Sequence, residues 1–239
     1  MTGRQPGRFS SRRDAGRQLA AALLPLAAER PVVIGLPRGG VPVAEEVAVA
    51  LGAVLEVLAV RKIGAPGNPE YGIGAIAEDG TRVLDRGAVA ALEIDDDTMA
   101  AIVARESAEL SRRVEAYRGG RAAIALRGRT AIVVDDGVAT GVTDTAALRA
   151  ARRREPRRLV LAVPVCAPDS AARLRAEADE LVCLIEPEPL YGVGQWYEDF
   201  AQVADAGVLA ALARAGPGAP GKAAADRRFP ADGAPPHRP

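Results

Sequence analysis

Two adjacent carboxylates, Asp135 and Asp136, stand between a run of apolar residues (131–134) and a segment of small and hydroxyl-bearing residues (137–143). Backbone N–H groups at a turn that opens a helix bind anions well. Carboxylates just before such a turn suit sugar hydroxyls or a metal ion. The pattern therefore predicts a site for a phosphorylated sugar. The alternative is an ordinary strand-to-helix turn with an incidental acid, which leaves the paired carboxylates unexplained.

The residues that follow fit the same chemistry, with two threonine hydroxyls as donors and two glycines that let a phosphate approach the backbone. The segment VVDDGVATGVT (133–143) resembles the motif by which type I phosphoribosyltransferases bind phosphoribosyl pyrophosphate (PRPP). The resemblance implies that Asp135 and Asp136 are catalytic and contact the ribose hydroxyls and Mg²⁺. It implies that the 5′-phosphate is bound by Gly137, Val138, Ala139, Thr140, Gly141 and Thr143.

Two further groups of residues are candidates for binding pyrophosphate. Arg38, Gly39 and Gly40 follow the first predicted strand, and an arginine fork suits oxygen anions. Taken alone, this is equally a glycine-rich turn with a solvated arginine, but the family binds pyrophosphate at this position. Arg61 and Lys62 end the second predicted strand. They are either solvated or, as in several relatives, reach the pyrophosphate of a neighbouring subunit, which implies a homodimer.

A residue that transfers a proton is expected outside the phosphate motif. Some relatives carry an acid where this chain has Ala139, which cannot transfer a proton. Residues 62–80, rich in Gly and Pro, are expected to form a functional loop or a small flap. They contain Glu70-Tyr71-Gly72, which is similar to the segment that supplies the glutamate of adenine phosphoribosyltransferases. Glu70 is therefore the candidate catalytic acid or base, and a solvated glutamate is the alternative.

Four of the aromatic residues cluster in residues 188–200, after the last predicted strand. The segment is similar to the base-binding segment of hypoxanthine-type transferases, which implies a small C-terminal hood. Tyr191 matches the aromatic that stacks on the base, and Trp196 is the second base-binding candidate. For Trp196 and Phe200, anchoring a C-terminal helix is an equally good interpretation.

Short β-branched runs alternate with Ala-rich helical stretches along the chain. This order predicts an α/β fold with a mostly parallel, twisted sheet of about five strands, helices on both faces, and the ligand at the carboxyl ends of the strands. The resemblance implies that residues 1–214 form one phosphoribosyltransferase domain, with 186–214 hood-like, and 215–239 are expected to be a disordered tail. Strands are predicted at 31–36, 54–60, 131–134, 158–163 and 181–185, and helices at 41–51, 95–117, 142–151 and 170–178.

Composition narrows the class of protein. The 31 basic and 31 acidic residues balance, which argues against nucleic acid and membranes as partners. The arginine cluster at 152–158 is expected to be solvent-exposed. With no long apolar run, no secretory signal, and Cys166 and Cys183 expected as buried thiols, a cytoplasmic protein is predicted. The one histidine, His237, lies in the tail, so histidine chemistry is not expected.

The functional hypothesis is an enzyme that uses PRPP and Mg²⁺ to transfer phosphoribose to a small nitrogenous acceptor, expected to be a nucleobase, with release of pyrophosphate. A non-catalytic regulatory protein that senses PRPP or a nucleotide is the first alternative. An enzyme of the same fold that acts on another phosphosugar, or that hydrolyses a nucleoside phosphate, is the second.

Overall fold

The computed structural model describes residues 8–219, apart from the side chains of Pro69 and Glu70. Its centre is a five-stranded sheet in the order β2-β1-β6-β7-β8, with every neighbouring pair parallel. The predicted α/β class and mostly parallel sheet are confirmed. The strands are β1 (Val32–Gly35), β2 (Val54–Val57), β6 (Thr130–Val134), β7 (Arg158–Val165) and β8 (Glu180–Ile185).

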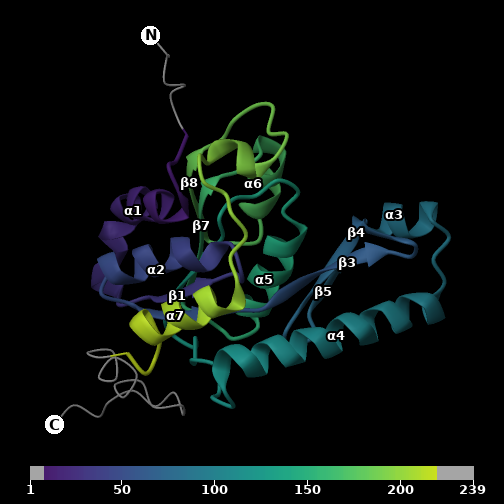
Figure 1. Cartoon of the computed structure of the whole chain (residues 1–239), viewed down its shortest axis with the longest axis horizontal. Helices are drawn as coiled ribbons and strands as arrows, with labels where there is room; N and C mark the ends of the chain where they lie inside the picture. Colours follow the sequence, from purple (N-terminus) through teal and green to yellow (C-terminus); the bar gives the residue numbers. More distant parts are fainter. Residues whose placement is uncertain (1–7, 220–239) are drawn as a thin grey trace.

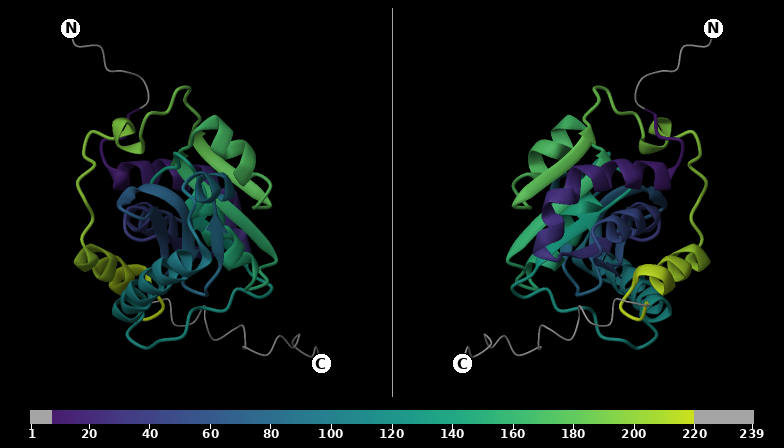
Figure 2. Two further views of the ribbon diagram at one scale, coloured as in Figure 1. Left: turned by 90° about the vertical axis from the view of Figure 1, so that its right-hand side faces the viewer. Right: turned by 90° about the vertical axis from the view of Figure 1, so that its left-hand side faces the viewer.

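Both faces of this sheet are covered by helices, as Figures 1 and 2 show, and strands buried on both faces are continuously apolar. Alternate strand residues point to opposite sides, so Val33 and Ile132 belong to one core and Val32 and Val133 to the other. The first core is covered by α1 (Arg12–Leu23), α2 (Gly40–Ala50) and α7 (Asp205–Ala215), and the second by α5 (Val142–Arg152) and α6 (Pro168–Leu174). Two short 3-10 helices are η1 (Leu24–Glu29) and η2 (Val193–Trp196).

The strand predicted at 54–60 ends at Val57, and residues 62–80 form the flap rather than a loop. A second, antiparallel sheet, β3-β4-β5, projects from the body with two helices (Figure 1). We call this unit the arm. Ile63 and Ile73 pack against Ile102 and Leu110 there, an apolar pattern that glycine and proline obscure in the sequence. The arm contains β3 (Val60–Ala65), β4 (Asn68–Ala77), β5 (Arg82–Leu84), α3 (Arg86–Ala91) and α4 (Asp96–Arg118).

Buried charges fix the arm to the body. Arg118, at the end of α4, donates to the carbonyl oxygen of Val57 and to the carboxylate of Glu78, both at 2.7 Å. Its Nε lies 3.5 Å from Glu56, which is fully buried in β2. Glu56 in turn accepts the backbone N–H of Ile124. Charges removed from water are tolerated only when they are paired and hydrogen-bonded in this way.

The arginine cluster at 152–158 is paired within the molecule. Arg152 pairs with Asp179 at 2.8 Å, and Arg157 and Arg158 both contact Glu29. In the described part of the chain, no helix is long and apolar enough to cross a membrane. The last described helix ends at Ala215, and most of the predicted tail (220–239), with His237, lies outside the described residues.

We expect Arg118→Met to lower the free energy of unfolding by about 3–5 kcal/mol, because it leaves Glu56 and Glu78 without their cation. Urea unfolding monitored by circular dichroism measures the loss. The matched control is Arg112→Met on the exposed surface of the same helix, where an ion pair contributes little. Equal stability of the two variants would contradict the structural role of Arg118.

Candidate functional site

The phosphate loop, residues 137–141, leaves β6 and enters α5 at the carboxyl edge of the sheet. Gly141 has φ +73° and Gly137 has φ +154°, conformations that L side chains rarely adopt. Val138 holds the loop to the end of β7 through paired backbone hydrogen bonds of 2.8 and 2.9 Å with Val165 and Ala167. The hydroxyl of Ser170 donates to the carbonyl oxygen of Ala139 at 2.7 Å. The loop is therefore braced from behind.

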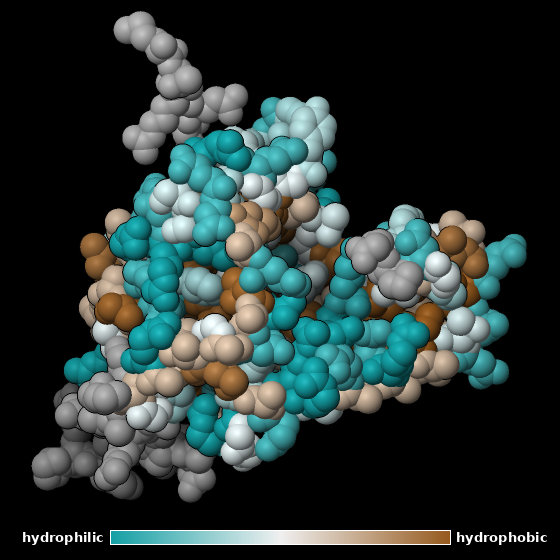
Figure 3. Space-filling model, in the orientation of Figure 1, coloured by the Kyte–Doolittle hydropathy of each residue, from teal (hydrophilic) through white to brown (hydrophobic). Residues whose placement is uncertain are grey.

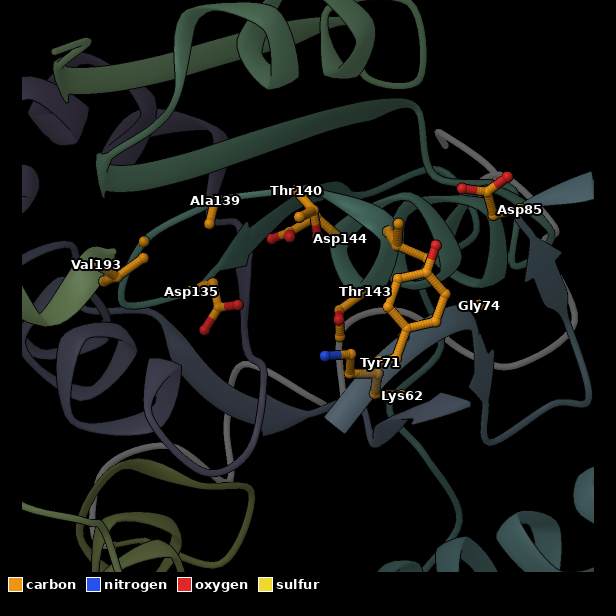
Figure 4. Close-up of a pocket in the computed structure, with 14 residues that line it drawn as sticks. Lys62, Tyr71, Gly74, Asp85, Asp135, Ala139, Thr140, Thr143, Asp144 and Val193 are labelled. Carbon is orange, nitrogen blue, oxygen red and sulfur yellow. The ribbon is translucent and has the colours of Figure 1, made fainter. Parts of the chain in front are cut away.

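A cavity of about 510 Å³ opens in front of this loop, between the body and the arm (Figure 4). The space-filling view shows the surface hollowed between these two parts (Figure 3). The body contributes Asp135, Gly137, Ala139, Thr140, Gly141, Val142, Thr143, Asp144 and Val193. The arm contributes Lys62, Tyr71, Gly72, Gly74 and Asp85.

The structure brings most of the predicted phosphate-binding residues to this cavity, together with Asp135 and Lys62. Val138 is the exception in the loop, because its side chain is buried in the core behind it. Asp136 is also not among the lining residues. Its carboxylate instead accepts a hydrogen bond of 2.7 Å from Arg12 of α1.

Gly39 and Gly40 lie directly against the two acids. A Cβ on Gly39 would stand 2.0 Å from Oδ2 of Asp136, and one on Gly40 would stand 2.6 Å from the carbonyl oxygen of Val134. Only glycine fits at Gly40, where the obstacle is backbone, and a side chain at Gly39 would displace the Asp136 carboxylate. The peptide that precedes Arg38 is cis, and the Arg38 side chain reaches toward Asp205, 4.0 Å away. The predicted pyrophosphate loop and the acidic pair are thus in contact, although Arg38 does not line the cavity.

The predicted basic pair is split between two faces of β3. Lys62 lines the cavity, whereas Arg61 donates to Glu106 at 2.7 Å and lies 3.5 Å from Glu109, both on α4. Successive side chains of a strand point to opposite faces, so the two cations cannot both enter the cavity. Glu70 lies in β4 next to the cavity-lining Tyr71, and its side chain is outside the described residues.

The hood candidates lie away from the cavity. Tyr191 is 82% exposed, and Trp196 packs beside Phe9 and Tyr197. Val193 is the residue of this segment that reaches the cavity, and its side chain fills the space that Gly137 leaves beside it. The segment is anchored by Tyr197, whose hydroxyl donates to the carbonyl oxygen of Asp136 at 2.5 Å. The sequence offered Trp196 and Phe200 as anchors of a C-terminal helix, whereas the aromatic residue that bonds to Asp136 is Tyr197.

Asp144, in the first turn of α5, is a site residue that sequence reasoning missed. It is only 3% exposed, it lines the cavity, and its Oδ1 has no hydrogen-bond partner within the described chain. Burial raises the pKa of Asp144 from 3.8 to about 7. Burial also raises the pKa of Asp135 well above its ordinary value, and nearby Asp136 and Asp144 add to the shift. The floor of the cavity is therefore rich in carboxyl groups that resist full ionisation.

A parallel sheet with a glycine-containing loop and an acidic pair at its strand ends is the arrangement that the resemblance to type I phosphoribosyltransferases implied. A family model of the phosphoribosyl transferase domain matches residues 12–195, and the chain belongs to this family. The matched region begins at Arg12 and ends at Gln195, so it includes residues 137–141, the arm and the first part of the segment predicted as a hood.

Named relatives agree with this membership. The chain is 50% identical over 207 residues to the Mycobacterium tuberculosis (strain H37Rv) protein Rv0571c, provisionally named a phosphoribosyl transferase. The match covers 87% of this chain and 47% of Rv0571c, so the chain spans about half the length of this relative. The crystal structure of TT1426 from Thermus thermophilus superimposes with a TM-score of 0.73 at 47% identity, covering 87% of this chain and 99% of that one.

We expect Asp144→Asn to change how stability depends on pH. The folded protein keeps the Asp144 proton up to about pH 7, whereas the unfolded chain releases it near its ordinary pKa of 3.8. The free energy of unfolding therefore falls as pH rises between these values, by up to about 4 kcal/mol at about 1.4 kcal/mol per pKa unit. The asparagine variant lacks this contribution, so its stability relative to the wild type should rise with pH.

Urea unfolding of both proteins at about pH 4, 5.5 and 8 measures the difference. Asp144 also raises the pKa of Asp135, so the difference between the two curves reports the loss of Asp144 together with the change that this loss causes at Asp135. A difference in stability that stays constant across this range would contradict the assigned pKa.

Proposed function

We propose that this protein transfers the phosphoribosyl group of PRPP to a small nitrogenous acceptor, with a nucleobase as the expected class, and releases pyrophosphate in a Mg²⁺-dependent reaction. The observation that carries the proposal is the half-buried Asp135 carboxylate beside a braced anion-binding loop, facing Lys62 across one cavity. Membership of the phosphoribosyl transferase family supports it.

The 5′-phosphate of PRPP would occupy the loop, where backbone N–H groups at the start of α5 and the hydroxyls of Thr140 and Thr143 act as donors. Asp135 would accept the ribose hydroxyls. Lys62, with the backbone at Gly39 and Gly40, would meet the pyrophosphate. The residues bind and orient the sugar while its C1–oxygen bond to pyrophosphate breaks and a bond to the acceptor nitrogen forms.

The cavity fits a Mg²⁺ ion that arrives with the substrate. Mg²⁺ is commonly held by one or two carboxylates together with phosphate oxygens and water. Among residues 8–219, no group of three or more His, Cys, Asp or Glu side chains is arranged to hold a metal by itself. Asp135 would supply the protein oxygen, and the ion would neutralise charge on the pyrophosphate. Asp136, the second predicted ligand, has Arg12 as its partner instead.

The arm would form the acceptor side of the cavity. Tyr71 and Asp85 line it opposite the phosphate loop, and Tyr71 is half exposed. A planar aromatic face and a carboxylate are groups that can stack on a heterocycle and accept its N–H. The homodimer and the cytoplasmic location expected from the family likewise remain proposals. In a dimer, Arg61 would contribute to the subunit contact on the surface of the arm, because it pairs with α4 and does not line the cavity.

Binding of PRPP tests the proposal directly. Isothermal titration calorimetry of the wild type should show PRPP binding that Mg²⁺ strengthens. Asp135→Asn should weaken it roughly 10- to 150-fold, because a hydrogen bond to a charged group contributes about 1.5–3 kcal/mol. Asp97→Asn, at an exposed position in α4, is the control and should bind normally. Unchanged affinity in Asp135→Asn would refute the site.

Turnover is tested separately at Glu70. We expect Glu70→Gln to lower kcat by about 10²–10⁴-fold with PRPP affinity nearly unchanged, because general acid–base catalysis contributes a factor of that size. Pyrophosphate release across a panel of nucleobases measures it, with the exposed Glu115→Gln as control. Normal turnover in Glu70→Gln, or loss of PRPP binding, would count against the assigned role. PRPP binding without turnover in the wild type would favour the regulatory alternative.

A further inference from the structure

Asp136 already has a cationic partner. Nε of Arg12 donates to its Oδ2 at 2.7 Å, and the two side chains are only 11% and 14% exposed. Arg12 is the first residue of α1 and lies 124 positions before Asp136 in the chain. Arg12 therefore contributes to the acidic pair from an element outside the phosphate motif.

Other contacts hold Arg12 in this position. Its Nη1 donates to the carbonyl oxygen of Ala201 at 2.8 Å. Its guanidinium also stacks on the ring of Phe200, with the central carbon 3.8 Å from the ring centroid, a distance suited to a cation–π interaction. An arginine whose planar group is fixed on two sides loses little further freedom when it binds a carboxylate.

The backbone of Asp136 is held by the same pair of chain segments. Tyr197 donates its hydroxyl to the carbonyl oxygen of Asp136, and residues around Tyr197 pair with Phe9 through two backbone hydrogen bonds of 2.8 Å. Figure 2 shows the start of α1 beside the segment that contains η2. We call Phe9, Arg12, Tyr197 and Phe200 the terminal clamp.

Asp135 is in a different situation. It lines the cavity, and its Oδ1 accepts the backbone N–H of Asp136 at 2.8 Å. Within residues 8–219 no salt bridge involves Asp135, and the Arg12 charge acts on it only from beyond ion-pair distance. Two ionised carboxylates side by side would repel each other and an incoming polyphosphate. The Arg12 cation compensates one of these charges and leaves the other facing the cavity.

We propose that Arg12 is a positioning residue of the phosphoribosyl site, which neutralises and orients Asp136 so that Asp135 alone is presented to the sugar hydroxyls and the divalent cation. The inference rests on the proposed function for the identity of the ligand. It differs from the family pattern, in which both motif acids are expected to meet the ligand. It also makes the N-terminal helix a part of the site.

Titration calorimetry with three variants tests this role. Arg12→Met removes the cation but keeps a long apolar side chain, and we expect it to weaken PRPP binding without Mg²⁺ at least about tenfold, since an uncompensated carboxylate then faces the polyphosphate. It should bind Mg²⁺ alone more tightly, because Asp136 becomes available. The double variant Arg12→Met with Asp136→Asn should regain PRPP affinity and lose the added Mg²⁺ affinity. Arg17→Met, an exposed position on α1, is the control and should match the wild type.

Each outcome separates a positioning role from a structural one. A purely structural Arg12 would lower stability and both affinities together, and the double variant would not recover, which would overturn the proposal. A double variant weaker than Arg12→Met would identify Asp136 as a ligand and would also overturn it. If the wild type binds no PRPP, the proposed function fails. The role of Arg12 is then decided by the stabilisation that Mg²⁺ alone gives to the wild type, Arg12→Met and the double variant in thermal unfolding.

Discussion

The parallel pairing of β1 with β6 is the constraint on which the site depends. Its register sets Gly35 opposite Val134, so the chains that leave the two strands run side by side. The loop after β1 must then pass directly against Asp135 and Asp136, which is possible only because Gly39 and Gly40 carry no side chain. The predicted pyrophosphate loop and the acidic pair are thereby brought into contact. Helices on both faces exclude water from this strand pair, so every residue of β1 and β6 is buried.

The arm adds the second wall of the cavity and is held to the body in two ways. Val60 and Ala77 pack into the apolar core beneath α5. Arg118 adds buried ion pairs with Glu56 on β2 and with Glu78, which directly follows β4. Directional bonds of this kind fix orientation more strictly than apolar contact does. The distance across the cavity, from the phosphate loop to Lys62, thus depends on the charged cluster around Arg118, at the C-terminal end of α4. The site is shaped by residues that never reach it.

Features encoded by neighbouring residues were predictable from the sequence, and features made by distant ones were not. The five parallel strands and the phosphate loop are each continuous in the chain, so periodicity and motif identify them. The arm strands were missed because Gly and Pro interrupt their alternation. Asp144 looked like an ordinary helix residue until its burial was known. Arg12 and Tyr197 meet Asp136 only through the fold, and no local pattern indicates that an arginine 124 positions away neutralises a motif acid.

The terminal clamp has a consequence for the order in which the protein matures. During synthesis the chain emerges from the ribosome N-terminus first, so α1 and the first strands are available long before residues 197–201. The backbone partners of Phe9, at Trp196 and Glu198, are synthesised about 190 residues after it. Contacts between such remote positions are slow to form because a long loop must close first. The sheet is complete only once β8 (Glu180–Ile185) has been made, so the nascent protein would close the clamp around Asp136 only after its last strand.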